Sequence, residues 1–102
     1  MILVTLDYTV PLDRIDAVIE PHRALLNDLA VRGVIICSGP KNPRTGGVML
    51  MNVDTVEAAQ EILSADPFMQ NNLATYDYTD FTPIKCAPEF RVFLNSGKSI
   101  EI

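Results

Sequence analysis

The chain has 102 residues, about the size of one domain, and its 48% hydrophobic and 21% charged residues are typical of a folded globular protein. Its 13 acidic and 8 basic side chains give a net charge of −5, and the basic residues are scattered singly. Nucleic acids and anionic membranes require clustered cations, so we expect a single domain over residues 1–102 that binds neither.

The sequence also indicates where the protein resides. No apolar run reaches the roughly 18 residues of a transmembrane helix, and the first residues lack the basic and small-residue pattern of a signal peptide. Cys37 and Cys86 are too isolated for a disulfide framework. We expect Cys37 to be a small core residue and the protein to be cytoplasmic.

The first third of the chain predicts a strand followed by a helix. Apolar and polar side chains alternate over residues 1–9, as in a strand. Over residues 13–32 the apolar side chains recur at three- and four-residue steps, with Asp13 as N-cap and Gly33 as terminator. Pro21 removes one backbone hydrogen bond inside this helix, so we expect a kink or a restart there.

The middle of the chain predicts two strands and a second helix. Residues 34–38 and 47–53 carry apolar side chains on both faces and are separated by a loop rich in proline and glycine. A helix over residues 55–64 follows, with Asp54 opening a modified capping box. Asp66, followed by a proline, then starts a short helical turn.

The last third predicts one strand and a less regular tail. Residues 75–84 alternate as a fourth strand. Over residues 85–102 we expect either an added strand or a contact with a partner subunit, because three apolar residues alternate there, namely Phe90, Val92 and Leu94.

The order of these elements, βαββαβ, is the ferredoxin-like α+β arrangement: a four-stranded antiparallel sheet with two helices on one face. The second and third strands are apolar on both sides, so the other face of the sheet also needs cover. We therefore expect a homodimer in which two sheets pack face to face.

His22 is the only histidine, and it lies on the apolar stripe of the first helix, so it should face the sheet. It is either a packed core histidine or a general acid/base, since a histidine titrates near neutral pH. Asp66 is either the N-cap of the turn that follows it or a carboxylate that orients His22. The spacing does not show that the two meet, but the topology allows it.

Other residues offer a binding surface. Ser38, Gly39 and Pro40 end the second strand, where they form a turn or let a ligand approach closely, with Ser38 as a hydrogen-bond donor. Four aromatic residues are either core residues or pocket walls: Tyr8, Phe68, Tyr76 and Tyr78.

Common catalytic motifs are missing from the sequence. The chain lacks a G-x-S-x-G motif and a second histidine, which argues against a Ser-His-Asp hydrolase. It also lacks nucleotide-binding fingerprints and a cluster of metal ligands. We expect neither a metal nor a cofactor.

Several segments, taken in order, carry a family resemblance. They are Pro21-His22-Arg23, Leu29 to Gly33, Ser38-Gly39-Pro40, Gly47, Glu57-Ala58-Ala59, Asp66-Pro67-Phe68 and Phe81-Thr82-Pro83-Ile84. Over about residues 1–85 this set resembles the YCII-related (YciI-like) family of small bacterial proteins. The tail extends beyond the family pattern.

This resemblance implies a dimeric α+β barrel whose active site is a His–Asp pair, here His22 and Asp66, with Ser38 as a third contributor. It implies acid–base reactions such as dehydrochlorination of a hydroxylated aromatic. Similar barrels include muconolactone isomerase-like enzymes and monooxygenases that act without a tightly bound cofactor, a likeness of fold that identifies no substrate.

Three hypotheses follow. The leading one is a small enzyme that uses His22 and Asp66 for isomerisation or elimination on a small cyclic or aromatic substrate. The second is a module that binds a small molecule or a protein partner without turnover. In the third, His22 is a packed core residue and Asp66 is a helix cap.

Overall fold

The computed structural model describes residues 1–94 of the chain and contains one four-stranded antiparallel sheet. The strands lie side by side in the order β2-β3-β1-β4, so the first strand is central and the second is at an edge. This order is the ferredoxin-like one and confirms the predicted fold class. The strands are β1 (Ile2–Tyr8), β2 (Ile35–Pro40), β3 (Gly46–Met51) and β4 (Ala74–Asp80).

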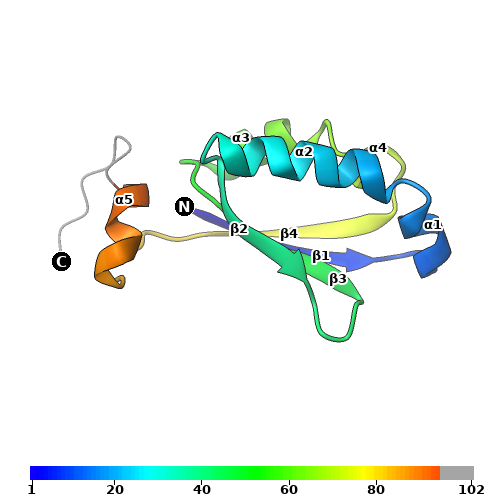
Figure 1. Cartoon of the computed structure of the whole chain (residues 1–102), viewed down its shortest axis with the longest axis horizontal. Helices are drawn as coiled ribbons and strands as arrows, with labels where there is room; N and C mark the ends of the chain where they lie inside the picture. The colour runs from blue at the N-terminus through cyan, green and yellow to red at the C-terminus, as the bar shows by residue number, and fades with distance from the viewer. Residues whose placement is uncertain (95–102) are drawn as a thin grey trace.

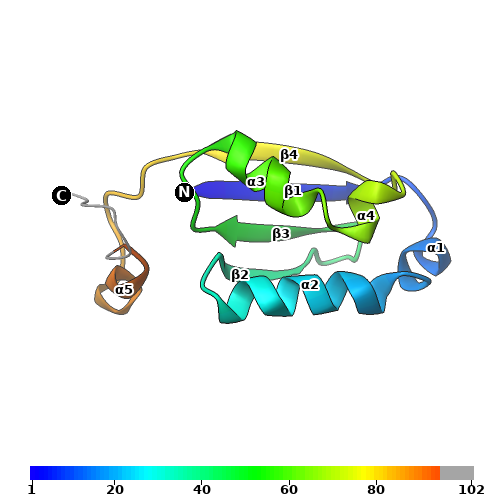
Figure 2. The same ribbon diagram turned by 90° about the horizontal axis from the view of Figure 1, so that it is seen from above.

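Two main helices, α2 (Ile19–Val31) and α3 (Val56–Leu63), lie on one face of the sheet (Figures 1 and 2). The short helix α4 (Pro67–Gln70) follows α3 on the same face, and α1 (Leu12–Asp16) lies beyond the end of β1. Because the helices cover one face only, the core lies between the helices and the sheet.

The predicted first helix is divided into α1 and α2, and the break lies at Ala17 and Val18. Pro21 is therefore in the first turn of α2, where a missing N–H leaves no helical hydrogen bond unmade. The expected restart is present, but it precedes the proline. Gly33 follows the helix with a φ of +75°, the left-handed conformation that a terminating glycine provides.

Two of the three predicted helix caps are wrong. Pro11 occupies the N-cap of α1, so Asp13 lies inside the first turn. Thr55, and not Asp54, caps α3: its side chain accepts a hydrogen bond from the Ala58 N–H at 3.0 Å. Both errors are shifts of one or two residues, which local sequence patterns do not resolve.

The core is built from strand residues that face the helices and from the apolar stripes of the helices. Cys37, in contrast, is exposed, which contradicts the prediction of a core cysteine. It lies after an irregularity between Ile35 and Cys37 in β2, an edge strand, and its register partner Leu50 belongs to the face that no helix covers. The core strand residues are Ile2, Val4, Leu6, Ile35, Met49 and Met51.

After β4 the chain leaves the sheet and runs without helix or strand over residues 81–87. It then forms a 3-10 turn η1 (Pro88–Phe90) and a helix α5 (Arg91–Leu94). An added strand, one of the two expectations for the tail, is therefore wrong for residues 85–94. The rest of the tail, residues 95–102, lies outside the described residues. The Asn52 side-chain amide donates a hydrogen bond to the Phe93 carbonyl at 3.1 Å, which links the tail to the end of β3. None of the helices within residues 1–94 is long and apolar enough to span a membrane.

Candidate active site

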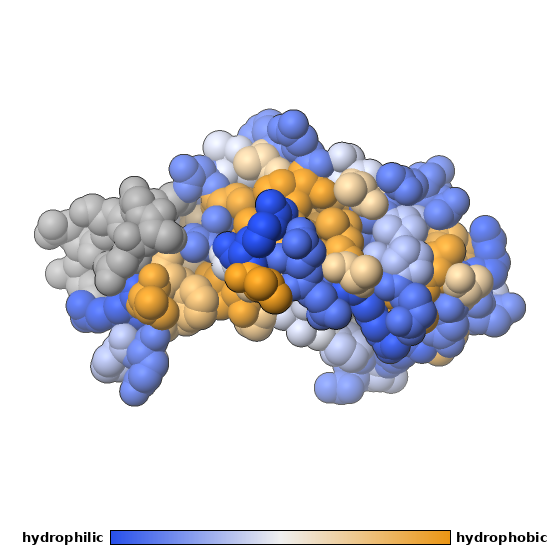
Figure 3. All heavy atoms as spheres, turned by 45° about the horizontal axis from the view of Figure 1, so that its top comes forward, coloured by the Kyte–Doolittle hydropathy of each residue, from blue (hydrophilic) through white to orange (hydrophobic). Residues whose placement is uncertain are grey.

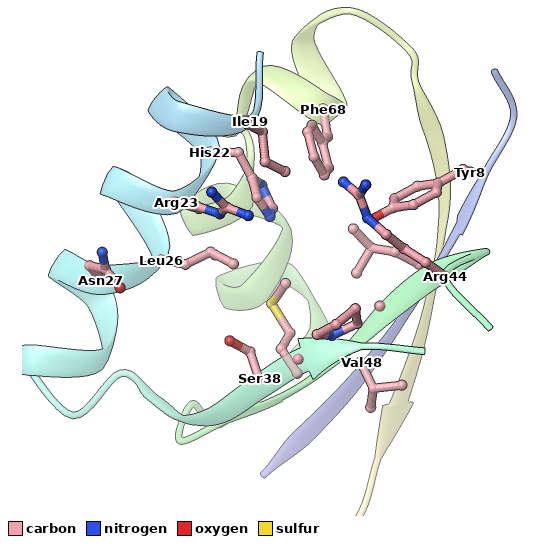
Figure 4. Close-up of a pocket in the computed structure, with 15 residues that line it drawn as sticks. Tyr8, Ile19, His22, Arg23, Leu26, Asn27, Ser38, Arg44, Val48 and Phe68 are labelled. Atoms are coloured by element: carbon pink, nitrogen blue, oxygen red, sulfur yellow. The ribbon is translucent and has the colours of Figure 1, made fainter. Parts of the chain in front are cut away.

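A pocket of about 220 Å³ lies between α2 and the strands β2 and β3 (Figure 4). A cavity of about 150 Å³ holds a benzene molecule. The pocket therefore has room for one substituted six-membered ring. Its walls come from β1, α2, β2, the loop before β3, β3 itself and α4.

His22 and Asp66 meet at the back of this pocket. His22 is 9% exposed and lines the pocket, whereas Asp66 is fully buried behind it. Nδ1 of His22 lies 2.9 Å from both carboxylate oxygens of Asp66. An ionised carboxylate only accepts hydrogen bonds, so Nδ1 carries the proton and donates it. Nε2 then has a free lone pair, and it has no hydrogen-bond partner within residues 1–94.

The predicted capping role of Asp66 is also present. Its Oδ1 accepts a hydrogen bond from the Phe68 N–H at 2.9 Å, which caps α4. The ring of Phe68 stacks on the His22 imidazole, with centroids 3.8 Å apart and planes 7° apart. One short helix thus positions both the carboxylate that holds the imidazole and the ring that covers one of its faces.

The five residues predicted for substrate binding all line the pocket: Tyr8, Ser38, Gly39, Pro40 and Phe68. The Ser38 hydroxyl points into it (Figure 4). A Cβ added at Gly39 would meet no atom within 4 Å, so the glycine is not needed there to make room for a ligand. These residues form walls around the His22 imidazole.

Tyr76 and Tyr78 do not line the pocket; they pack against the core from β4. Both hydroxyls are buried without a hydrogen-bond partner among residues 1–94. Burial raises the pKa of Tyr76 far above its usual value, and the nearby Asp66 carboxylate raises it further. Tyr76 therefore stays a neutral phenol beside the His–Asp pair.

Several pocket residues were not predicted. Ile19 and Leu26 lie three and four positions from His22 on the same helix, so helical spacing would have placed them beside it. Arg44 was missed because it belongs to the loop before β3, and only the folding of that loop brings it to the pocket. The remaining unpredicted residues are Arg23, Asn27 and Met49, with Leu6, Gly47 and Val48 from the strands.

The fold and the site together define a class of protein: a ferredoxin-like domain with a buried His–Asp pair at a small pocket. The chain matches the YCII-related domain over residues 1–82 and belongs to this family. No curated protein matches it in sequence.

A solved structure with a similar fold is the 5-chloro-2-hydroxyhydroquinone dehydrochlorinase TftG from Burkholderia phenoliruptrix AC1100, in complex with 2,5-dihydroxybenzoquinone. The two chains align with a TM-score of 0.63 and 20% sequence identity, over 80% of this chain and 94% of TftG. At this identity the similarity establishes the shared fold.

Proposed function

We propose that the protein is a small enzyme that catalyses elimination or isomerisation on a cyclic or aromatic compound by moving a proton. One observation carries this proposal: Asp66 binds Nδ1 of His22, which leaves Nε2 as a base at the pocket. A histidine that served packing alone would need neither a pocket at its free edge nor a buried carboxylate behind it.

In the proposed reaction Nε2 takes a proton from a ring carbon next to a carbonyl group. The electron pair of the broken C–H bond forms a C=C bond. In an elimination, a leaving group such as chloride departs from the neighbouring carbon with its bonding electrons. In an isomerisation, a C=C bond already present in the ring shifts, and its electron pair forms the new C–H bond when the imidazolium returns the proton to a different carbon. Asp66 keeps Nδ1 protonated and stabilises the imidazolium, and a positioned base of this kind contributes about 10²–10⁴-fold to the rate.

The shape of the pocket supports a flat substrate. Phe68 presents an aromatic wall next to the imidazole, and Tyr8 packs edge-on against Phe68 with centroids 6.0 Å apart. TftG, which has the same fold, is a dehydrochlorinase for a chlorinated hydroxyhydroquinone. We extend the class of reaction, and not the compound, to this protein.

The test measures proton transfer directly. The protein is incubated in D2O with 5-chloro-2-hydroxyhydroquinone, cyclic ketones and lactones, and deuterium incorporation and chloride release are followed. We expect turnover with at least one compound, and a loss of about 10²-fold or more in His22→Gln. Arg32→Gln is the control, because Arg32 is exposed and pairs with Asp28 outside the pocket.

Unchanged turnover in His22→Gln would contradict the proposal. So would ligands that bind in the pocket of the wild-type protein with neither deuterium incorporation nor chloride release. The second result would favour a binding module.

We also propose that the working form is a cytoplasmic homodimer. The helix layer presents apolar and hydrophilic residues side by side (Figure 3). The uncovered sheet face carries apolar side chains on β1 and β3. Leu3 and Leu50 are register partners on that face, and Val48 beside them is 38% exposed. Packing two such faces together would remove these side chains from water.

A further inference from the structure

The side chains that line the pocket are basic or neutral, although the chain as a whole is acidic. Acidic residues outnumber basic ones by 13 to 8 in the sequence, yet the pocket lining, drawn from residues 1–94, contains two arginines, one histidine and no carboxylate. Three neutral polar side chains complete the polar lining, namely Tyr8, Asn27 and Ser38. This combination offers hydrogen-bond donors and positive charge, which suits an anion.

Arg44 is the better placed of the two arginines. Arg23 also lines the pocket, but it pairs with Glu20 through side chains that are 62% and 81% exposed, so water screens its charge. Arg44 is only 35% exposed. Its guanidinium extends into the space between Phe68 and Tyr8, across the pocket from the His22 ring (Figure 4).

A carboxylate holds Arg44 in this position. Nη2 of Arg44 donates a hydrogen bond to Oδ1 of Asp16 at 2.6 Å, which ties the loop before β3 to the end of α1. This bond raises the pKa of Arg44, and the Tyr8 hydroxyl contributes in the same direction, so the guanidinium keeps its charge. A guanidinium has five N–H donors, and Asp16 engages Nη2 alone, so donors remain for a ligand.

We propose that Arg44, with the Tyr8 hydroxyl beside it, forms a carboxylate-binding subsite, and that the substrate is a flat cyclic carboxylate. Guanidinium groups bind carboxylates through two parallel hydrogen bonds, which fix orientation as well as position. A carboxylate held there leaves the attached ring between Arg44 and His22, where Nε2 reaches a ring C–H group. The role of the ring in this inference rests on the proposed function; the binding of the carboxylate does not.

The experiment uses two isosteric probes that do not react, benzoate and benzamide. Each is titrated at pH 7 into the full chain labelled with ¹⁵N, and dissociation constants are taken from the NMR shifts of pocket residues. We expect benzoate to bind at least about tenfold more tightly than benzamide, because one charge-assisted pair is lost with the amide. Added salt should weaken benzoate binding and leave benzamide binding nearly unchanged.

Variants assign the subsite. Arg44→Gln should remove the preference for benzoate, whereas Arg32→Gln, a change outside the pocket, should keep it. Asp16→Asn should retain it within a few-fold, because Asp16 positions the guanidinium and does not contact the ligand. Equal binding of the two probes, no shift of pocket signals with either, or a preference that survives in Arg44→Gln would each overturn the proposal.

The same series separates this inference from the proposed function. His22→Gln should still prefer benzoate, because holding a carboxylate requires no proton transfer. If the preference disappears in His22→Gln and persists in Arg44→Gln, the histidine and not the arginine binds the anion, and the subsite is refuted. If wild-type protein and Arg44→Gln behave as expected but no compound turns over, the subsite stands and the catalytic proposal fails.

Discussion

Replacing Asp66 separates its two roles, since the carboxylate both holds the His22 imidazole and caps α4. Asp66→Asn keeps a side-chain oxygen that accepts from the Phe68 N–H, and asparagine is as good an N-cap as aspartate. The amide NH₂ then faces Nδ1 of His22. Because that group only donates, Nδ1 must become an acceptor and the ring proton moves to Nε2. Asp66→Ala removes both interactions.

The magnitudes follow from the hydrogen bonds in the structure. A hydrogen bond to a charged group contributes about 1.5–3 kcal/mol, so Asp66→Asn should lower the free energy of unfolding by about 2 kcal/mol. Asp66→Ala also loses the cap, worth about 1 kcal/mol, and leaves two buried donors unpaired. Its total loss should be about 3–4 kcal/mol. The difference between the two variants thus measures the cap together with the cost of leaving the buried donors unpaired.

Two assays check this reasoning. Urea unfolding gives the stabilities, and long-range ¹H–¹⁵N NMR of the imidazole gives the tautomer. His22 is the only histidine in the chain, so its signals need no further assignment. In its neutral form the wild-type ring should carry its proton on Nδ1, and the ring in Asp66→Asn should carry it on Nε2.

A wild-type ring with its proton on Nε2 would refute the proposed orientation of the base. Equal stability of Asp66→Asn and Asp66→Ala would show that the cap contributes nothing. Either result would be decisive without knowledge of the substrate.

Three further predictions concern the scaffold. Gly46→Ala should cost about 3 kcal/mol or prevent folding, because its Cβ would overlap a main-chain oxygen of β1, whereas Gly39→Ala should change stability by less than about 1 kcal/mol in denaturant melts. The free energy of unfolding should fall as the pH rises above about 10, because the unfolded chain ionises its tyrosines while the raised pKa of Tyr76 keeps that side chain neutral in the folded protein. Between pH 10 and pH 11, urea titrations should show that Tyr76→Phe loses about 1 kcal/mol less of this free energy than the wild-type protein does. In analytical ultracentrifugation, Leu50→Asp should convert the proposed dimer into monomers. The control is Val31→Asp, which should leave the dimer intact because Val31 is 89% exposed on the helix layer. A monomeric wild-type protein would contradict the proposed assembly.

Local patterns were sufficient to predict the order of the elements and the direction in which His22 faces. Alternation with a period of two marks the strands, and a helical stripe puts His22 on the side of the sheet. The capping role of Asp66 could also be predicted from the sequence, because a side-chain acceptor directly before Pro67 accepts a hydrogen bond from an N–H group of the turn that it begins. In each case the physical cause acts over a few neighbouring residues.

The tertiary structure alone decided which of these residues meet. His22 and Asp66 are 44 positions apart, and their contact depends on how α2 and α4 pack on the same face of the sheet. Arg44 reaches the pocket because the loop before β3 folds toward α1, where Asp16 binds it. The exposure of Cys37 has the same origin, since an apolar segment is buried only where another element covers it, and the edge strand β2 has no helix over its outer face. Local periodicity determines which way a side chain points, and packing between distant segments determines what it faces.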